Sequence, residues 1–172
     1  IRSRCVTLTM NPVEKDKICT YLENKFQLEP EQAQIAANYC QGNIGKAIRF
    51  ASSSDFIEMK NQVLKLLKNL DSMDIASIID TIKEFSTHKN DINDYLDLML
   101  LWYRDVLMFK VTKDANLLLY SDEYSAISEQ ATKRDYENIE NIIAAIDKAK
   151  VRLKANVNFD VTIELMILAM KD

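Results

Sequence analysis

Glycine and proline are scarce in this sequence of 172 residues, which contains 2 of each. All four lie within the first 45 positions, as Pro12, Pro30, Gly42 and Gly45. Architectures built from several β-hairpins need glycine for turns with positive φ and proline for loops, so this composition excludes them. Rossmann and P-loop nucleotide sites are excluded as well, since each needs clustered glycines. The composition therefore predicts an ordered, all-α protein.

Metal-ligating and disulfide-forming residues are also few. His88 is the only histidine and lies far in sequence from Cys5, Cys19 and Cys40, so we expect no Cys/His zinc site. Three cysteines leave one unpaired under any disulfide scheme, which favours free thiols in a reducing compartment such as the cytoplasm. No apolar run approaches the ~20 residues that cross a bilayer, and we expect no signal peptide. Because the chain begins at Ile1 without an initiator Met, we expect it to be part of a longer protein.

An excess of positive charge is lacking too, because 22 Lys and Arg face 26 Asp and Glu, a net charge of −4 at pH 7. A protein that binds nucleic acid mainly through its net charge has more basic than acidic residues. Residues 1–55 carry 7 basic and 6 acidic side chains, whereas residues 56–172 carry 15 and 20. The basic cluster at 148–154 is split over two sides of a predicted helix, and we interpret it as a solvated helix end. A helical nucleic-acid-binding module that uses this cluster is the minority alternative.

The first 53 residues predict a small module of three helices. We expect the first helix to start with Asn11 as its cap and Pro12 in its first turn. The second starts near Pro30 and ends at Gly42 in the C′ position, and a third spans about residues 44–50. The run Ser-Ser-Ser-Asp that follows is a polar linker, so we place the domain boundaries at 1–53 and 54–172.

Residues 54–172 predict a bundle of four or five longer helices. Apolar residues recur at helical spacing in four stretches, 63–70, 75–85, 92–107 and 139–153. We expect Asp71 or Ser72 to start the second of these helices, and residues 111–134 to form only short helical turns. Residues 159–170 are apolar on most sides, which indicates a helix buried within the bundle or an interface.

Acidic and histidine side chains do not form a convincing catalytic site. Asp91, Asp94 and Asp97 recur every three residues along a predicted helix, but no partner helix with histidine or glutamate ligands is evident. We interpret them as a solvated acidic face. His88 lies in a polar connector and is interpreted as a surface histidine, because no nucleophile or acid lies near it in sequence.

Four segments carry a family resemblance. Ser3-Arg4-Cys5 is similar to the Ser-Arg-Cys motif that ends the AAA+ nucleotide-binding domain of bacterial clamp-loader subunits. Residues 42–48, Gly-Asn-Ile-Gly-Lys-Ala-Ile, resemble the Gly-x-x-Arg-x-Ala-Leu sensor-2 element of the three-helix lid that follows this domain. Residues 101–107 look like a helix of the collar domain, and residues 153–159 resemble the end of one such subunit. The order and spacing of these segments extend the resemblance over the whole chain.

The resemblance implies a three-helix AAA+ lid followed by a helical-bundle collar that serves oligomerisation. Clamp loaders are five-subunit machines that use ATP to open a sliding clamp and close it on primed DNA. The resemblance assigns Arg4 as an arginine finger that reaches the ATP site of a neighbouring subunit in trans, with Ser3 and Cys5 in support. A guanidinium suits this role because it is always charged and bonds phosphate oxygens in a bidentate way.

Gly45 departs from the family pattern, because it stands where the sensor-2 arginine is expected. Glycine has no side chain to bond a γ-phosphate, so we expect no cofactor in this chain and ATP only at a neighbouring subunit. Lys46 would point about 100° away on a helix and is no substitute. The departure favours the stator-like subunit of the loader over its motor subunits.

The implied partners are the other clamp-loader subunits, bound through the collar. The sliding clamp and primed DNA would be contacted indirectly, and no membrane is involved. The chain would not be an enzyme by itself but a part of a DNA polymerase complex in DNA replication. Two alternatives stay open: a motor-type subunit of the same loader, and a stand-alone helical interaction scaffold unrelated to ATP.

Overall fold

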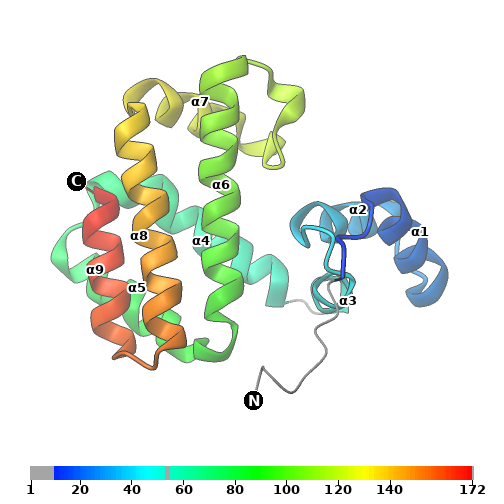
Figure 1. The fold of residues 1–172 in the computed structure, drawn as a ribbon, viewed down its shortest axis with the longest axis horizontal. Helices are drawn as coiled ribbons and strands as arrows, with labels where there is room; N and C mark the ends of the chain where they lie inside the picture. Colours follow the sequence, from blue (N-terminus) through cyan, green and yellow to red (C-terminus); the bar gives the residue numbers. More distant parts are fainter. Residues whose placement is uncertain (1–9, 53–54, 172) are drawn as a thin grey trace, which may run out of the picture. The chain divides into compact units, whose positions relative to one another are not determined.

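A computed structural model describes residues 10–52 and 55–171. The regular structure in these residues is entirely helical, with no strand among them, which confirms the all-α prediction. No helix in the described part of the chain is both long and apolar enough to cross a membrane. The chain divides into two compact units, Ile1–Phe56 and Ile57–Asp172 (Figure 1). The domain boundary expected after residue 53 falls on residues outside the described ranges and stays a prediction.

The small unit contains three helices, α1 (Lys15–Phe26), α2 (Pro30–Tyr39) and α3 (Ile44–Ser52). Each packs against the other two. Many of the side chains buried between them are small: Cys19, Ala33, Ala36, Ala37, Cys40 and Ala47. Small side chains let the helix axes approach closely, so a compact core forms from few residues. Cys19 and Cys40 are free thiols, and burial raises the pKa of both.

Two expected helix boundaries in the small unit are wrong. Helix α1 begins at Lys15, and its N-cap residue, Glu14, makes no side-chain cap bond. Pro12 instead lies in a loop contact, where the Val13 N–H donates to the Gly42 carbonyl at 3.0 Å. Helix α2 starts at Pro30 as expected, but its cap is Cys40 and the first left-handed residue after it is Gln41, with φ 52°. Gly42 therefore lies one residue beyond its predicted C′ position.

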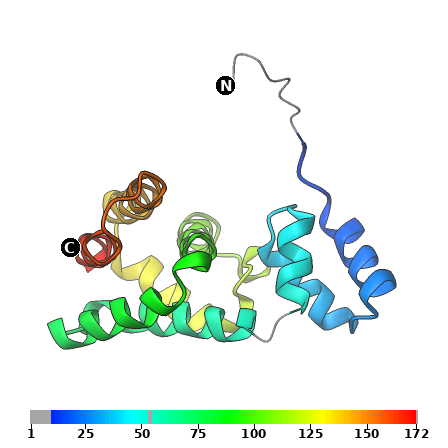
Figure 2. The same cartoon turned by 90° about the horizontal axis from the view of Figure 1, so that it is seen from below.

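The described part of the large unit contains six helices, and short 3-10 turns lie in three of the five connections between them. They are α4 (Asp55–Asn69), whose first two residues belong to the small unit, α5 (Ile75–Thr87), α6 (Ile92–Thr112), α7 (Tyr124–Lys133), α8 (Tyr136–Lys154) and α9 (Phe159–Lys171). Helix α8 packs between α6 and α9, and α9 also contacts α5. Figure 2 shows α6, α8 and α9 nearly end-on above a layer that contains α4 and α5. The core lies between these two layers.

Helix α6 supplies the centre of this core. It carries four large side chains with almost no exposed surface, Tyr95, Met99, Trp102 and Tyr103. Apolar burial on this scale stabilises a helix far more than its intrinsic propensity does. Residues 111–134 were predicted to form only short turns, and they contain the two 3-10 turns Ala115–Leu117 and Ser121–Glu123. They also contain α7, a full helix of 10 residues that the weak apolar periodicity did not predict.

The predicted start of α5 is wrong by two residues. Its cap is Asp74, which accepts a hydrogen bond from the Ser77 N–H at 2.8 Å. Asp71 and Ser72 instead belong to the 3-10 turn Leu70–Ser72 that closes α4. Asp74 accepts a second hydrogen bond from the Ser77 hydroxyl at 2.6 Å, and these bonds hold its pKa below the ordinary value.

Candidate subunit interface

The predicted arginine-finger motif cannot be placed in the fold. Arg4, Ser3 and Cys5 all lie outside the described residues. Their assignment therefore stays a prediction from the family resemblance.

The glycine element that resembles sensor 2 lies at the start of α3. Asn43 precedes the helix, and its side-chain oxygen accepts from the Lys46 N–H at 3.0 Å. Gly45 is exposed in the first turn, and a Cβ atom built on it would meet only the Asn43 side-chain oxygen, at 3.3 Å. This contact is tight but involves only a side chain, so a residue with a Cβ atom fits at position 45 once the Asn43 side chain shifts by a few tenths of an ångström. Backbone packing therefore does not exclude an arginine there.

Gly42 is constrained in a different way. Its φ of +78° is in the left-handed region, and a Cβ atom built on it would lie 2.5 Å from the Cβ atom of Pro12. The same atom would lie 2.9 Å from the Pro12 Cα, so the clash is with backbone. The two glycines of the element therefore differ, because only Gly42 is required by the geometry of the loop.

The aspartates of α6 are not a solvated acidic face. Asp94 is buried, with 5% of its surface exposed, and the Lys150 ammonium of α8 binds the Asp97 carboxylate. The interpretation fails because Asp94 is buried and Asp97 pairs with a lysine of α8, whereas sequence spacing does not show what lies opposite a helix face. The described residues contain no group of three or more His, Cys, Asp or Glu side chains placed to hold a metal ion.

Helix α9 is apolar on two opposite faces. Its inner face is buried against the bundle and consists of Thr162, Ile163, Met166, Ile167 and Met170. Its other side carries three exposed apolar residues that we call the outer stripe, Val161, Leu165 and Leu168, which are 48%, 46% and 42% exposed. Their spacing of four and three residues places them on one line along the helix. A continuous apolar line on the outside of a surface helix is typical of a protein–protein interface.

A buried arginine and a partly buried lysine fix the C-terminal end of α9. The Arg134 guanidinium is 6% exposed and donates to the Met170 carbonyl at 3.4 Å, to the Asp71 carboxylate at 2.7 Å and to the Asn138 side-chain oxygen at 2.8 Å. The Lys171 ammonium donates to the Met73 carbonyl. Arg134 thereby ties α9 to the end of α4 and the start of α8, so the outer stripe is presented on a fixed support.

Asp71 is the anionic partner in this cluster. Burial alone would raise the pKa of its carboxyl, but the hydrogen bond from Lys133 and the charge of Arg134 outweigh burial and hold that pKa below its ordinary value. Lys133 donates to Asp71 at 2.5 Å and, unlike Arg134, keeps 59% of its side chain exposed. Asp71 therefore stays ionised at neutral pH and neutralises the buried guanidinium.

A second set of polar side chains joins α6 to α7 and α4. The Trp102 indole N–H donates to the Gln130 side-chain oxygen at 3.0 Å, and the Gln130 amide donates to the Leu67 carbonyl at 2.9 Å. Asp105 is fully buried on the same helix and accepts from the N–H groups of Leu119 and Tyr120, at 2.7 and 2.8 Å. Burial raises the pKa of Asp105 despite these bonds.

Sequence reasoning missed these polar positions for a physical reason. Arg134 and Gln130 lie in a stretch with no long apolar repeat, and each has a partner 63 residues earlier in the chain. A single sequence gives the spacing along one helix but not the distant residue that a polar side chain meets. The signal that was readable is the two-sided apolar pattern of residues 159–170, which indicated either a buried helix or an interface.

The chain is similar to the delta-prime subunit of DNA polymerase III. It is 29% identical over 175 residues to "DNA polymerase III subunit delta'" of Bacillus subtilis (strain 168). The match covers 100% of this chain and 52% of that protein, so the chain spans about half the length of the curated relative. No family model matches the chain, and no solved structure matches it significantly. The match confirms the resemblance predicted from the sequence.

Proposed function

We propose that this chain is the lid and collar of a delta-prime-type subunit of the DNA polymerase III clamp loader. In this role it is non-catalytic and holds the pentameric loader together during DNA replication. The similarity to delta-prime over the whole chain carries the proposal. The outer stripe of α9 supports it, because an assembly domain needs an apolar surface on a rigid helix.

The partners under this proposal are the gamma/tau and delta subunits, bound through the collar. The sliding clamp and primed DNA are reached indirectly, through the assembled loader. The net negative charge of residues 56–172 supports this indirect role, since direct DNA binding needs a basic surface. We propose a cytoplasmic location, as part of the replisome.

The second part of the proposal concerns ATP. Arg4, flanked by Ser3 and Cys5, lends its guanidinium to the ATP site of a neighbouring subunit and stabilises charge on the transferred phosphoryl group. The chain holds no cofactor of its own, and Gly45 leaves its lid without an arginine that could read a γ-phosphate. Hydrolysis is therefore assisted in trans and not performed here.

The assembly role is tested on the outer stripe of α9 with the full-length subunit and its partners. Leu165→Asp combined with Val161→Asp places two charges on the stripe, and we expect loss of the loader complex in size-exclusion chromatography with light scattering. Val111→Asp is the matched control, since Val111 is also an exposed helical valine but lies at the end of α6. Normal assembly of the double variant, with an intact helical circular dichroism spectrum, would refute the proposed interface.

The arginine finger is tested separately in the reconstituted loader. We expect Arg4→Ala to lower clamp-loading ATPase activity while the complex still assembles, because the finger acts on chemistry and not on packing. Arg2→Ala is the control, since it removes a guanidinium two residues away in the same segment. If Arg4→Ala leaves the ATPase rate unchanged, the arginine-finger assignment is wrong, whereas the assembly role is unaffected.

A further inference from the structure

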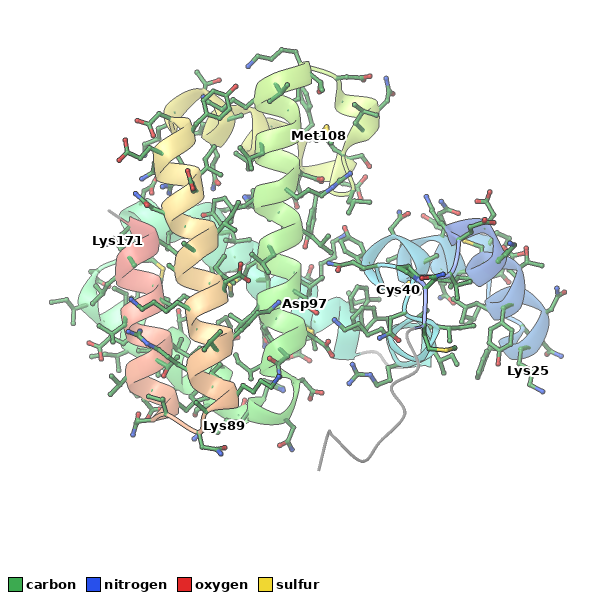
Figure 3. All side chains as sticks on the ribbon, in the orientation of Figure 1. Lys25, Cys40, Lys89, Asp97, Met108 and Lys171 are labelled. Atoms are coloured by element: carbon green, nitrogen blue, oxygen red, sulfur yellow. The ribbon has the colours of Figure 1, made fainter. Side chains whose placement is uncertain are left out.

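A groove of about 670 Å³ lies at one end of the large unit, where the start of α6, the end of α8 and the start of α9 meet. Three lysines line it, Lys89, Lys150 and Lys154, together with the apolar residues Val151, Val157 and Phe159 among others. Figure 3 labels Lys89 at this end of the unit, next to the loop that joins α8 to α9. The groove is separate from the outer stripe of α9.

The charge of this groove is opposite to that of its surroundings. Residues 56–172 carry 15 basic and 20 acidic side chains, yet the described lining of the groove holds three lysines and no carboxylate. Lys150 is bound to Asp97, which is not part of the lining. The Lys89 ammonium lies 4.9 Å from the centre of the Phe159 ring. Because Asp97 neutralises Lys150, the positive potential of the groove comes from Lys89 and Lys154.

The backbone around the groove has its own hydrogen bonds satisfied. The N–H groups of Asn156 and Val157 donate back to the carbonyls of Leu153 and Arg152, both at 3.0 Å, with Asn156 in the left-handed conformation at φ 57°. The Asn158 side chain caps α9 by accepting from the Val161 N–H at 3.1 Å. Because the last carbonyls of α8 are occupied, the lysines set the electrostatics of a loop that is already ordered.

The walls of the groove combine charge with exposed apolar surface. Val151 is 68% exposed and Val157 is 45% exposed. Phe159 is the one aromatic ring in the described lining, and the Lys89 ammonium lies over one of its faces, so the groove lacks the series of open rings on which successive bases stack. Aliphatic walls with cationic edges complement a peptide that carries both carboxylates and apolar side chains.

We propose that this groove binds an acidic, apolar-containing peptide segment of a partner protein. Carboxylates of the peptide pair with Lys89 and Lys154, and its apolar side chains cover Val151 and Val157. The inference does not depend on the clamp-loader role, because it rests only on the charge and shape of the groove.

The test is fluorescence anisotropy of the full chain with a fluorescein-labelled peptide of about 12 residues in which Glu alternates with Leu or Phe. We expect saturable binding that weakens as salt rises, since the attraction is between charges. Lys154→Glu should weaken binding about tenfold. Lys148→Glu is the matched control, because Lys148 is exposed on the same helix but does not line the groove, and it should change binding less than about twofold.

A second variant tests the apolar wall. Val151→Ser keeps the charge of the groove, and we expect it to weaken the peptide about threefold without changing the salt dependence. The proposal is overturned if the peptide does not saturate, or if Lys148→Glu and Lys154→Glu have equal effects. It is also overturned if a single-stranded oligonucleotide competes with the peptide and binds more tightly. A third contrary outcome is that Lys154→Glu abolishes self-association of the chain and leaves peptide binding unchanged.

Discussion

The contacts that stabilise the small unit internally differ in kind from those that stabilise the large unit. In the small unit the loop that joins α2 to α3 touches the residues before α1 through backbone atoms, at Gly42, Pro12 and Val13. In the large unit buried polar side chains join segments far apart in sequence, as Gln130 does when it binds the Leu67 carbonyl 63 residues earlier.

This difference explains why glycine is needed at position 42. The loop between α2 and α3 approaches Pro12 so closely that a residue with a Cβ atom does not fit there. The large unit buries broad apolar faces and defines its arrangement with a few hydrogen-bonded polar groups, which need no glycine. The predictions below test whether the large unit depends on such side chains and the small unit on backbone geometry.

The largest effect is expected from Trp102→Ala in the large unit. Trp102 is fully buried, so the change removes a large apolar volume and the donor to Gln130, and it should lower the free energy of unfolding by about 4 kcal/mol. Urea denaturation followed by circular dichroism measures this. Trp102→Phe retains most of the volume and should cost about 2 kcal/mol, because the Gln130 oxygen loses its donor. Equal losses in the two variants would show that the removed apolar volume costs nothing beyond the lost hydrogen bond.

Gly42→Ala is expected to have the next largest effect, in the small unit. The new methyl group would lie 2.5 Å from the Pro12 Cβ on a residue with φ +78°, and the loss should be about 3 kcal/mol. Amide hydrogen exchange of α1, α2 and α3 measures it. Exchange rates like those of the unchanged protein would mean that the contact between Gly42 and Pro12 does not hold the small unit.

The third prediction compares two cations that share Asp71. Arg134→Ala removes a buried guanidinium with three acceptors and should cost about 2 kcal/mol, whereas Lys133→Ala removes an exposed ammonium and should cost less than about 0.5 kcal/mol. Chemical denaturation of both variants under identical conditions gives the comparison. A Lys133 effect as large as that of Arg134 would show that burial does not decide the strength of this cluster.

Asp71 also predicts a pH dependence. Its pKa is lower in the folded protein than the ordinary value of about 3.9, so the unfolded chain binds its proton more readily. The stability that Asp71 contributes is therefore present above about pH 5 and is lost as the pH falls through the lowered folded-state pKa. We expect Asp71→Asn to show a shallower loss of stability between about pH 5 and pH 3 than the unchanged chain, measured by thermal unfolding. Parallel curves for the two proteins would contradict this.

The smallest effect is expected for Gly45→Arg, which introduces the arginine that the sensor-2 pattern contains. Position 45 is exposed in the first turn of α3, and a Cβ atom there requires only a small shift of the Asn43 side chain. The free energy of unfolding should therefore be unchanged or higher by about 0.5 kcal/mol. Thermal unfolding beside Gly42→Ala measures the contrast between the two glycines. A large loss at position 45 would mean that the fold, and not the function, excludes an arginine there.

The sequence alone was enough to predict the helical class and most of the helices. Long apolar stripes such as those of α6 and α8 have a period that only one secondary structure satisfies, and Pro30 marked the start of α2 because its fixed φ suits a first helical turn. The start of α1 and the cap of α5 were wrong. Which of several polar residues caps a helix depends on the chain segment that packs against them. Here the residues before α1 contact the loop at Gly42, and the helix begins after them.

The family resemblance and the departure at Gly45 were also readable from the sequence, because the order of motifs and the identity of a residue do not depend on tertiary contacts. Only the tertiary structure decided which face of α9 is outside, that Arg134 and Gln130 join distant helices, and that three lysines converge on a groove without a carboxylate. The physical reason is the same in each case. Periodicity fixes which residues share a side of one helix, whereas burial, pairing and local potential depend on the helices that pack against it.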